Sequence, residues 1–162
     1  MRILSLLVTF LLLSGCASDR IDTAVNQCCV DDKYETFTVK SENIPAFLGP
    51  LMVSNFSVAM ANQGLQPVTD NGDLVATLRY EQDTLSEQKA KDDFDEPMAM
   101  GAGQRFIARI AIEVRDARTD EIVYSGQVQR LHDVAAGEWM HTGRASQAIL
   151  TAFDEVLANF RE

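Results

Sequence analysis

Apolar and polar residues alternate, as they do in strands, in four stretches of the chain. Residues 34–40 are rich in β-branched and aromatic side chains, and residues 74–81 place an apolar side chain at every second position. Residues 106–115 and 122–128 alternate in the same way on either side of a polar connection at 116–120. These patterns predict a first strand, a second strand and an antiparallel hairpin.

Two other stretches carry apolar residues at every third or fourth position, which is the spacing of a helix. The first predicts a helix over residues 49–63, because Pro50 suits only a first helical turn and Gly64 suits a stop. The second predicts a final helix that begins near Thr142. The apolar stripes are Leu48, Met52, Phe56, Ala59 and Met60 in the first helix, and Ala145, Ile149, Ala152, Phe153, Val156 and Phe160 in the second.

The order strand, helix, three strands, helix predicts a single globular α+β domain over residues 34–162. Each element has one apolar face, so we expect a two-layer sandwich with both helices on one face of a four-stranded, mostly antiparallel sheet. The first strand–helix–strand unit is compatible with a right-handed parallel crossover. Residues 86–103 have no periodicity and predict a long loop, which in a compact domain is usually functional or disordered.

The N-terminal segment has a different composition. Met1 and Arg2 precede an apolar run over residues 3–13, which is shorter than the ~20 residues that a membrane-spanning helix needs. The positive start, the short apolar middle and the small residues that follow describe a secretory signal peptide over residues 1–15. The next residues are polar and lack periodicity, so we expect residues 16–33 to form a flexible tether.

The run Leu13-Ser14-Gly15-Cys16 resembles the lipobox of bacterial lipoproteins. The resemblance implies cleavage between Gly15 and Cys16, diacylation of the Cys16 thiol and acylation of the new amino terminus, with fatty acids such as palmitate. Ala17 resembles the pattern for delivery to the outer membrane, facing the periplasm, although retention in the inner membrane stays open. An ordinary signal peptide with a chance cysteine is the alternative.

The charge of the chain narrows the choice of partners. Its 162 residues carry 14 basic and 24 acidic side chains, and removal of Arg2 with the signal leaves 13 basic against 24 acidic, a net charge of −11. Such a surface repels polyphosphates, so we expect no nucleic-acid partner. It also repels anionic lipid headgroups, so the acyl chains on Cys16 must supply the membrane attachment.

The other two cysteines, Cys28 and Cys29, are neighbours and therefore a poor pair for an ordinary disulfide. A strained vicinal disulfide, a bridge to another molecule and two free thiols all remain open. A metal site would need more ligands nearby, and only Asp31 and Asp32 follow. We therefore expect no metal, no cofactor and no role for this pair in the tether.

The predicted hairpin over residues 110–126 carries a family resemblance. Its aliphatic strand ends in Asp116, a turn with Thr119 follows, and the return strand holds Tyr124 and Gly126. This pattern is similar to the signature hairpin of the bacterial lipoproteins grouped as domain of unknown function 4136. The family often has Trp at the position of Tyr124, and residues 86–103 have no clear counterpart. The resemblance implies the α+β fold and an envelope location, and it implies no catalytic residue.

An enzyme would need acid–base or nucleophilic groups that converge on one site. The two histidines, His132 and His141, belong to no recognisable motif, and we interpret both as solvated edge residues. The acidic run at residues 92–96 lacks the ligand spacing of a calcium loop, which favours a solvated charge run. We therefore predict no catalytic residue and no enzymatic activity.

Three large apolar side chains outside the predicted elements are candidates for contact with a partner: Met98, Met100 and Trp139. The alternative is that they close over the core. The sequence thus predicts a lipid-anchored periplasmic lipoprotein of the cell envelope that acts as a non-catalytic interaction module for an envelope protein. A carrier or sensor that holds a small apolar ligand between helices and sheet is the alternative. A hydrolase that uses His132 or His141 is a third.

Overall fold

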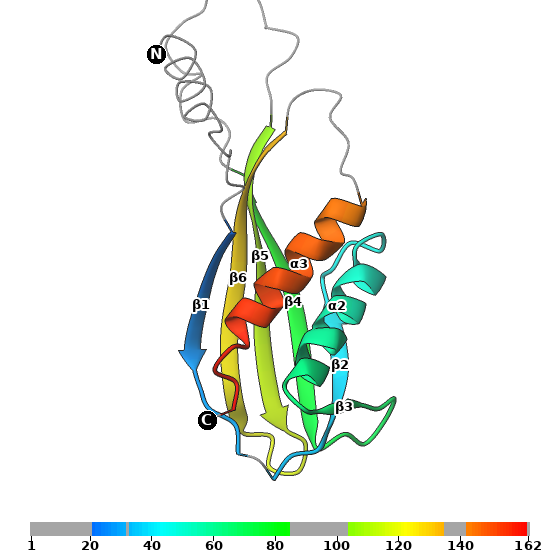
Figure 1. The fold of residues 1–162 in the computed structure, drawn as a ribbon. Helices are drawn as coiled ribbons and strands as arrows, with labels where there is room; N and C mark the ends of the chain where they lie inside the picture. The colour runs from blue at the N-terminus through cyan, green and yellow to red at the C-terminus, as the bar shows by residue number, and fades with distance from the viewer. Residues whose placement is uncertain (1–20, 32, 85–103, 135–141, 162) are drawn as a thin grey trace, which may run out of the picture.

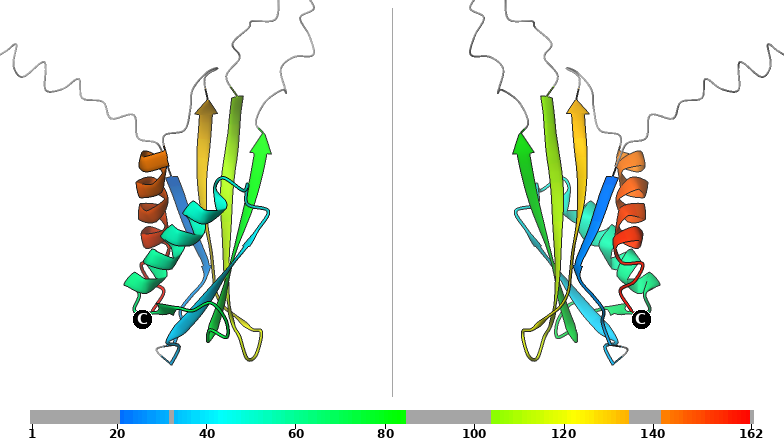
Figure 2. Two further views of the ribbon diagram at one scale, coloured as in Figure 1. Left: turned by 90° about the vertical axis from the view of Figure 1, so that its right-hand side faces the viewer. Right: turned by 90° about the vertical axis from the view of Figure 1, so that its left-hand side faces the viewer.

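The computed structural model describes residues 21–31, 33–84, 104–134 and 142–161, which form a sheet covered by two helices (Figure 1). The strands are β1 (Ile21–Gln27), β2 (Thr36–Glu42), β3 (Gln66–Pro67), β4 (Leu74–Thr84), β5 (Gln104–Asp116) and β6 (Ile122–Val134), and the helices are α2 (Gly49–Asn62) and α3 (Thr142–Val156). Both helices lie on one face of the sheet (Figure 2). The predicted α+β class is confirmed, but the predicted four-stranded sheet is wrong because the described residues alone form a sheet of six strands, in the order β1-β6-β5-β4-β2-β3.

The three long strands β4, β5 and β6 form the centre of the sheet. They pair antiparallel, with Ile112 opposite Leu78 on one side and Gly126 on the other. Because successive side chains of a strand point to opposite faces, the apolar set turns toward the helices and its polar neighbours turn away. The buried, helix-facing residues of these strands are Leu74, Ala76, Leu78, Ile110, Ile112, Val114, Tyr124 and Val128.

Strand β1 forms one edge of the sheet, where the sequence predicts part of a tether. It pairs antiparallel with β6, from Ile21 opposite Arg130 to Gln27 opposite Ser125. The folded domain therefore includes residues from Ile21 onward, and the expectation of a tether through residue 33 is wrong for this strand. Sequence reasoning missed β1 because its residues are exposed or only half-buried, so no apolar stripe marks it.

The opposite edge holds β2 and the two-residue strand β3. β2 runs parallel to both β3 and β4, which confirms a parallel arrangement for the first strand–helix–strand unit. Pro50 lies in the first turn of α2, and Gly64 follows the helix with a φ of 83°, which glycine adopts without strain. Gly72 passes so close to β2 that a Cβ there would lie 2.7 Å from the carbonyl carbon of Phe37.

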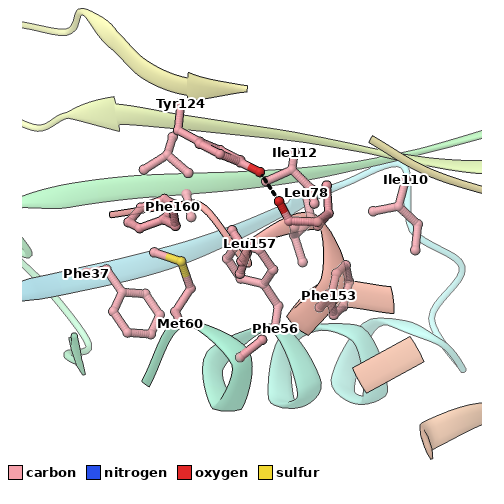
Figure 3. Packing of buried hydrophobic residues seen from close by; sticks show 14 of the residues in the cluster. Phe37, Phe56, Met60, Leu78, Ile110, Ile112, Tyr124, Phe153, Leu157 and Phe160 are labelled. Atoms are coloured by element: carbon pink, nitrogen blue, oxygen red, sulfur yellow. Dashed lines mark hydrogen bonds between the residues drawn. The ribbon is translucent and has the colours of Figure 1, made fainter. Parts of the chain in front are cut away.

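The hydrophobic core lies between the helices and the helix-facing side of the sheet (Figure 3). Phe56 of α2 and Phe153 of α3 meet edge to face, with ring centroids 5.2 Å apart. Tyr124 packs on Phe160 at 5.0 Å, and its hydroxyl donates a hydrogen bond to the carbonyl oxygen of Val156. Burial raises the pKa of Tyr124 to about 12, so this phenol stays a neutral donor. The predicted apolar stripe of the first helix is buried throughout.

Candidate functional site

The face of the sheet that is turned away from the helices has no covering element in the described part of the chain (Figure 2). We call this surface the open face. Every second residue of five strands contributes to it, and most of these residues are polar or charged. They are Asp22, Ala24 and Asn26 of β1; Thr38, Lys40 and Glu42 of β2; Val75, Thr77, Arg79, Glu81 and Asp83 of β4; Ile107, Arg109, Ala111, Glu113 and Arg115 of β5; and Ser125, Gln127, Gln129 and Leu131 of β6.

Ion pairs lie across the open face, so it does not present charge of one sign. They join Arg79 to Glu42 at 2.9 Å, Arg109 to Glu81 at 3.4 Å and Arg115 to Glu113 at 2.7 Å. The hydrogen bond from Arg79 to Glu42 raises the pKa of the guanidinium group. Exposed pairs of this kind contribute little to stability, so both signs of charge remain available to a binding partner.

A shallow hollow of about 160 Å³ crosses the open face. Small residues such as Ala111, Ser125 and Gly126 contribute to its lining, and it extends from Arg79 of β4 to Asn26 of β1. The residues that line it are Asn26, Thr77, Arg79, Ala111, Ile112, Glu113, Ser125, Gly126 and Gln127. Hydroxyl, amide, guanidinium and carboxylate groups together can donate and accept hydrogen bonds, which suits the docking of polar side chains.

A second hollow, of about 330 Å³, lies at the end of the sheet that carries the turn between β5 and β6. Its lining includes Tyr34, Asp116 and both Cys28 and Cys29, which are joined to each other in a disulfide. Of the three states that the sequence left open for these cysteines, the structure contains the vicinal disulfide. The pair therefore belongs to the folded domain and not to a tether, which corrects the sequence-based expectation.

Two carboxylates near this second hollow hold the backbone in place. Asp116 accepts hydrogen bonds from the hydroxyl of Tyr34 and from the backbone N–H groups of Arg118 and Thr119. These bonds, that of Tyr34 first, lower the pKa of Asp116. Asp73 accepts hydrogen bonds from backbone N–H groups at the start of β2, which lower its pKa as well. Both carboxylates thus fix turns at one end of the sheet.

The candidate functional residues predicted from the sequence lie outside the described residues. These are Gly15 and Cys16 at the predicted cleavage site and the candidate contacts Met98, Met100 and Trp139. In the sequence, Met98 lies between the end of β4 at Thr84 and the start of β5 at Gln104, and Trp139 lies between β6 and α3. All of these element ends belong to the same end of the sheet, opposite the turn between β5 and β6 (Figure 1).

The surroundings of His132 differ from the solvated edge position that the sequence predicts. Its ring stacks on that of Phe106, with centroids 4.7 Å apart and an interplanar angle of 10°, and the side chain is half-buried rather than solvated. His141 lies outside the described residues. Within residues 21–31, 33–84, 104–134 and 142–161, no three or more His, Cys, Asp or Glu side chains are grouped to hold a metal ion. No helix in these segments is long and apolar enough to cross a membrane.

No protein-family model and no curated protein matches the chain. Solved structures do share its fold. The PelC dodecamer from Paraburkholderia phytofirmans is 12% identical, with a TM-score of 0.53 over 88% of this chain and 100% of that one.

Bacterial lipoproteins are also among the similar structures. Rare lipoprotein B from Shewanella oneidensis is 13% identical over 76% of this chain and 92% of that one, with a TM-score of 0.41. Lipoprotein GNA1162 from Neisseria meningitidis is 9% identical over 75% and 99%, with a TM-score of 0.43. At such identities the likeness extends to the fold alone, and the resemblance to domain of unknown function 4136 stays a prediction.

Proposed function

We propose that this protein is a lipid-anchored lipoprotein of the bacterial envelope that works without catalysis, by docking an envelope protein on the open face. The open face is the observation that carries the proposal. A six-stranded sheet normally buries one face and can leave the other in water, where its side chains are free to bind. Here that face combines ion pairs with a hollow of about 160 Å³.

The chemistry of the open face favours a protein as its occupant over a lipid surface or nucleic acid. Its cationic side chains, such as Arg79, Arg109 and Arg115, each lie beside a carboxylate. A membrane or a polyphosphate would need an excess of positive charge, which neither this face nor the acidic chain supplies. A protein surface with alternating charges can match such a pattern, and matched charges set the register of docking.

In this proposal the chain is cleaved between Gly15 and Cys16, and acyl chains on Cys16 anchor the protein in the membrane. Ala17 favours the outer membrane, with the domain in the periplasm, and retention in the inner membrane is the alternative. The PelC structure with the same fold is a dodecamer, so a second copy of this chain is one form that the protein partner can take. A carrier for an apolar ligand would need a cavity between helices and sheet, whereas the two hollows described among residues 21–31, 33–84 and 104–134 both lie outside that interface.

Site-specific photocrosslinking in living cells tests the docking surface. A photoreactive amino acid replaces Thr77 or Gln127 on the open face, and Thr151, which is exposed on α3, serves as the matched control. We expect one product of discrete mass from both open-face positions and none from the control. A product at twice the mass of this chain identifies a second copy as the partner. Equal crosslinking from Thr151, or none from either open-face position, would contradict the proposal.

A further inference from the structure

The position of β1 limits how the domain can stand on a membrane. Ile21, its first residue, lies opposite Arg130, which lies opposite Ala108, so all three occupy one row across the sheet. Cys16 precedes Ile21 by five residues. An extended chain spans at most ~3.6 Å per residue, so the link from the proposed acylation site to this row is at most about 18 Å long.

The two ends of the sheet lie at unequal distances from this row. β5 begins at Gln104, four residues from Ala108, and ends at Asp116, eight residues from Ala108. At ~3.4 Å per residue, the first end lies about 14 Å from the row and the second about 27 Å. We call these the near end and the far end. A link of about 18 Å can place the near end on the membrane surface, whereas it is too short to place the far end there.

Charge opposes the remaining arrangement, in which the domain lies flat. The mature chain is strongly acidic, and anionic headgroups repel it. Acidic side chains belong to both ends of the sheet. The loops and turns of the far end carry Asp31, Glu35, Asp70, Asp73, Asp120 and Glu121, and the segment that joins β4 to β5 at the near end carries the acidic run at residues 92–96. A flat domain would bring the acidic groups of both ends to the headgroups, while an upright one holds those of the far end away by about the length of the sheet.

We infer that the domain stands upright, with the Gln104 end of β5 toward the membrane and the turn between β5 and β6 away from it. This inference rests on the proposed acylation of Cys16. The strands then run roughly along the membrane normal, so the open face is reached from the side by a partner in the periplasm (Figure 2). The hollow beside Tyr34 and Asp116 faces away from the membrane, and the segments that carry Met98 and Trp139 join the domain at the membrane side.

Energy transfer from tryptophan to a headgroup-labelled lipid tests this orientation. The full-length acylated protein, carrying Trp139→Phe, receives Thr84→Trp at the near end or Thr119→Trp in the far turn, and is reconstituted in vesicles with dansyl-labelled lipid. Both positions are exposed, and ten residues of β5 separate Phe106, which is opposite Thr84, from Asp116, or about 34 Å. We expect several-fold stronger transfer from Thr84→Trp. Equal transfer, or stronger transfer from Thr119→Trp, would overturn the upright arrangement.

Two controls separate this inference from the proposal on which it rests. Insertion of ten Gly and Ser residues after Ser18 removes the limit on reach, so the difference between the two positions should shrink. The Cys16→Ser protein should give no transfer from either position because it does not bind the vesicles. Failure of the protein with an intact Cys16 to bind contradicts the lipid anchor itself, whereas binding with equal transfer contradicts only the orientation.

Discussion

The hydroxyl of Tyr34 donates a hydrogen bond of 2.8 Å to Oδ2 of Asp116, 82 residues further along the chain. Both side chains are buried. Asp116 also accepts hydrogen bonds from the backbone N–H groups of Arg118 and Thr119, in the turn that joins β5 to β6. This one carboxylate therefore connects the segment before β2 to the hairpin. The far end of the sheet is therefore held by a polar contact as well as by the apolar core.

Replacement of Tyr34 by Phe should destabilise the domain. The change leaves a buried carboxylate oxygen of Asp116 without its donor, and an unsatisfied buried acceptor costs more than a lost surface contact. Tyr80→Phe is the matched control, because the hydroxyl of Tyr80 donates only to the exposed side chain of Gln82. Urea unfolding should give a clearly lower midpoint for Tyr34→Phe than for Tyr80→Phe. Equal midpoints would show that the buried contact contributes nothing.

Acid should weaken the fold through the same carboxylate. Hydrogen bonds lower the pKa of Asp116 in the folded chain below its ordinary value of 3.8, so its contribution to stability is complete above that value and is lost as the pH falls toward the folded pKa. We expect the urea midpoint to fall as the pH is lowered below about 3.8. Asp116→Asn should make this fall shallower, and Asp73, whose pKa is also lowered, should account for part of the remainder. An unchanged slope in Asp116→Asn would contradict this assignment.

Gly72→Ala should be among the most damaging substitutions of a glycine. Its Cβ would lie 2.7 Å from the carbonyl carbon of Phe37 and 2.8 Å from the backbone nitrogen of Thr38, and backbone atoms cannot move aside cheaply. Overpacking of this kind typically costs about 1–3 kcal/mol of unfolding free energy. Gly49→Ala is the control, since a Cβ there meets nothing within 4 Å and alanine favours the helix. Thermal or urea unfolding should separate the two variants, and similar stabilities would refute the close approach.

Ala17→Asp should change which membrane holds the protein. In the lipoprotein pattern that residues 13–16 resemble, the residue after the acylated cysteine directs sorting, and Ala17 favours the outer membrane. Density-gradient separation of the two membranes should find the wild-type chain in the outer fraction and Ala17→Asp in the inner one. Wild-type protein in the inner fraction would show that the outer-membrane assignment is wrong.

The central elements of the fold could be predicted because their residues have one strongly apolar face. Alternation in β4, β5 and β6 and the helical stripe through Phe56 are direct consequences of burial on one side. β1 and β3 have no such face: β1 is an exposed edge strand, and β3 has two residues. Their pairing depends on backbone hydrogen bonds to a neighbour, which the side-chain pattern does not encode.

The alternation of polar and apolar residues in the sequence indicates that the open face exists, but it does not identify this face as a binding site. Arg109, Glu113 and Arg115 alternate with the apolar residues of β5, which places them together on the face away from the core. Such alternation also occurs on any solvated strand, so it does not by itself indicate binding. The structure adds two observations that the sequence pattern lacks. Both helices lie on the other face of the sheet, and a hollow on the open face is lined by small residues such as Ala111 and Ser125 together with charged ones.

The proposed function depends on membrane attachment through the acyl chains of Cys16, and flotation of Cys16→Ser is the decisive test of this attachment. Membranes and soluble protein from cells that express the wild-type chain or Cys16→Ser are separated by flotation, with palmitate labelling of each chain and circular dichroism of the variant as checks on acylation and folding. We predict that the wild-type chain is labelled and floats with membranes, while Cys16→Ser is unlabelled, soluble and folded. A Cys16→Ser protein that still floats with the membranes would contradict attachment through Cys16.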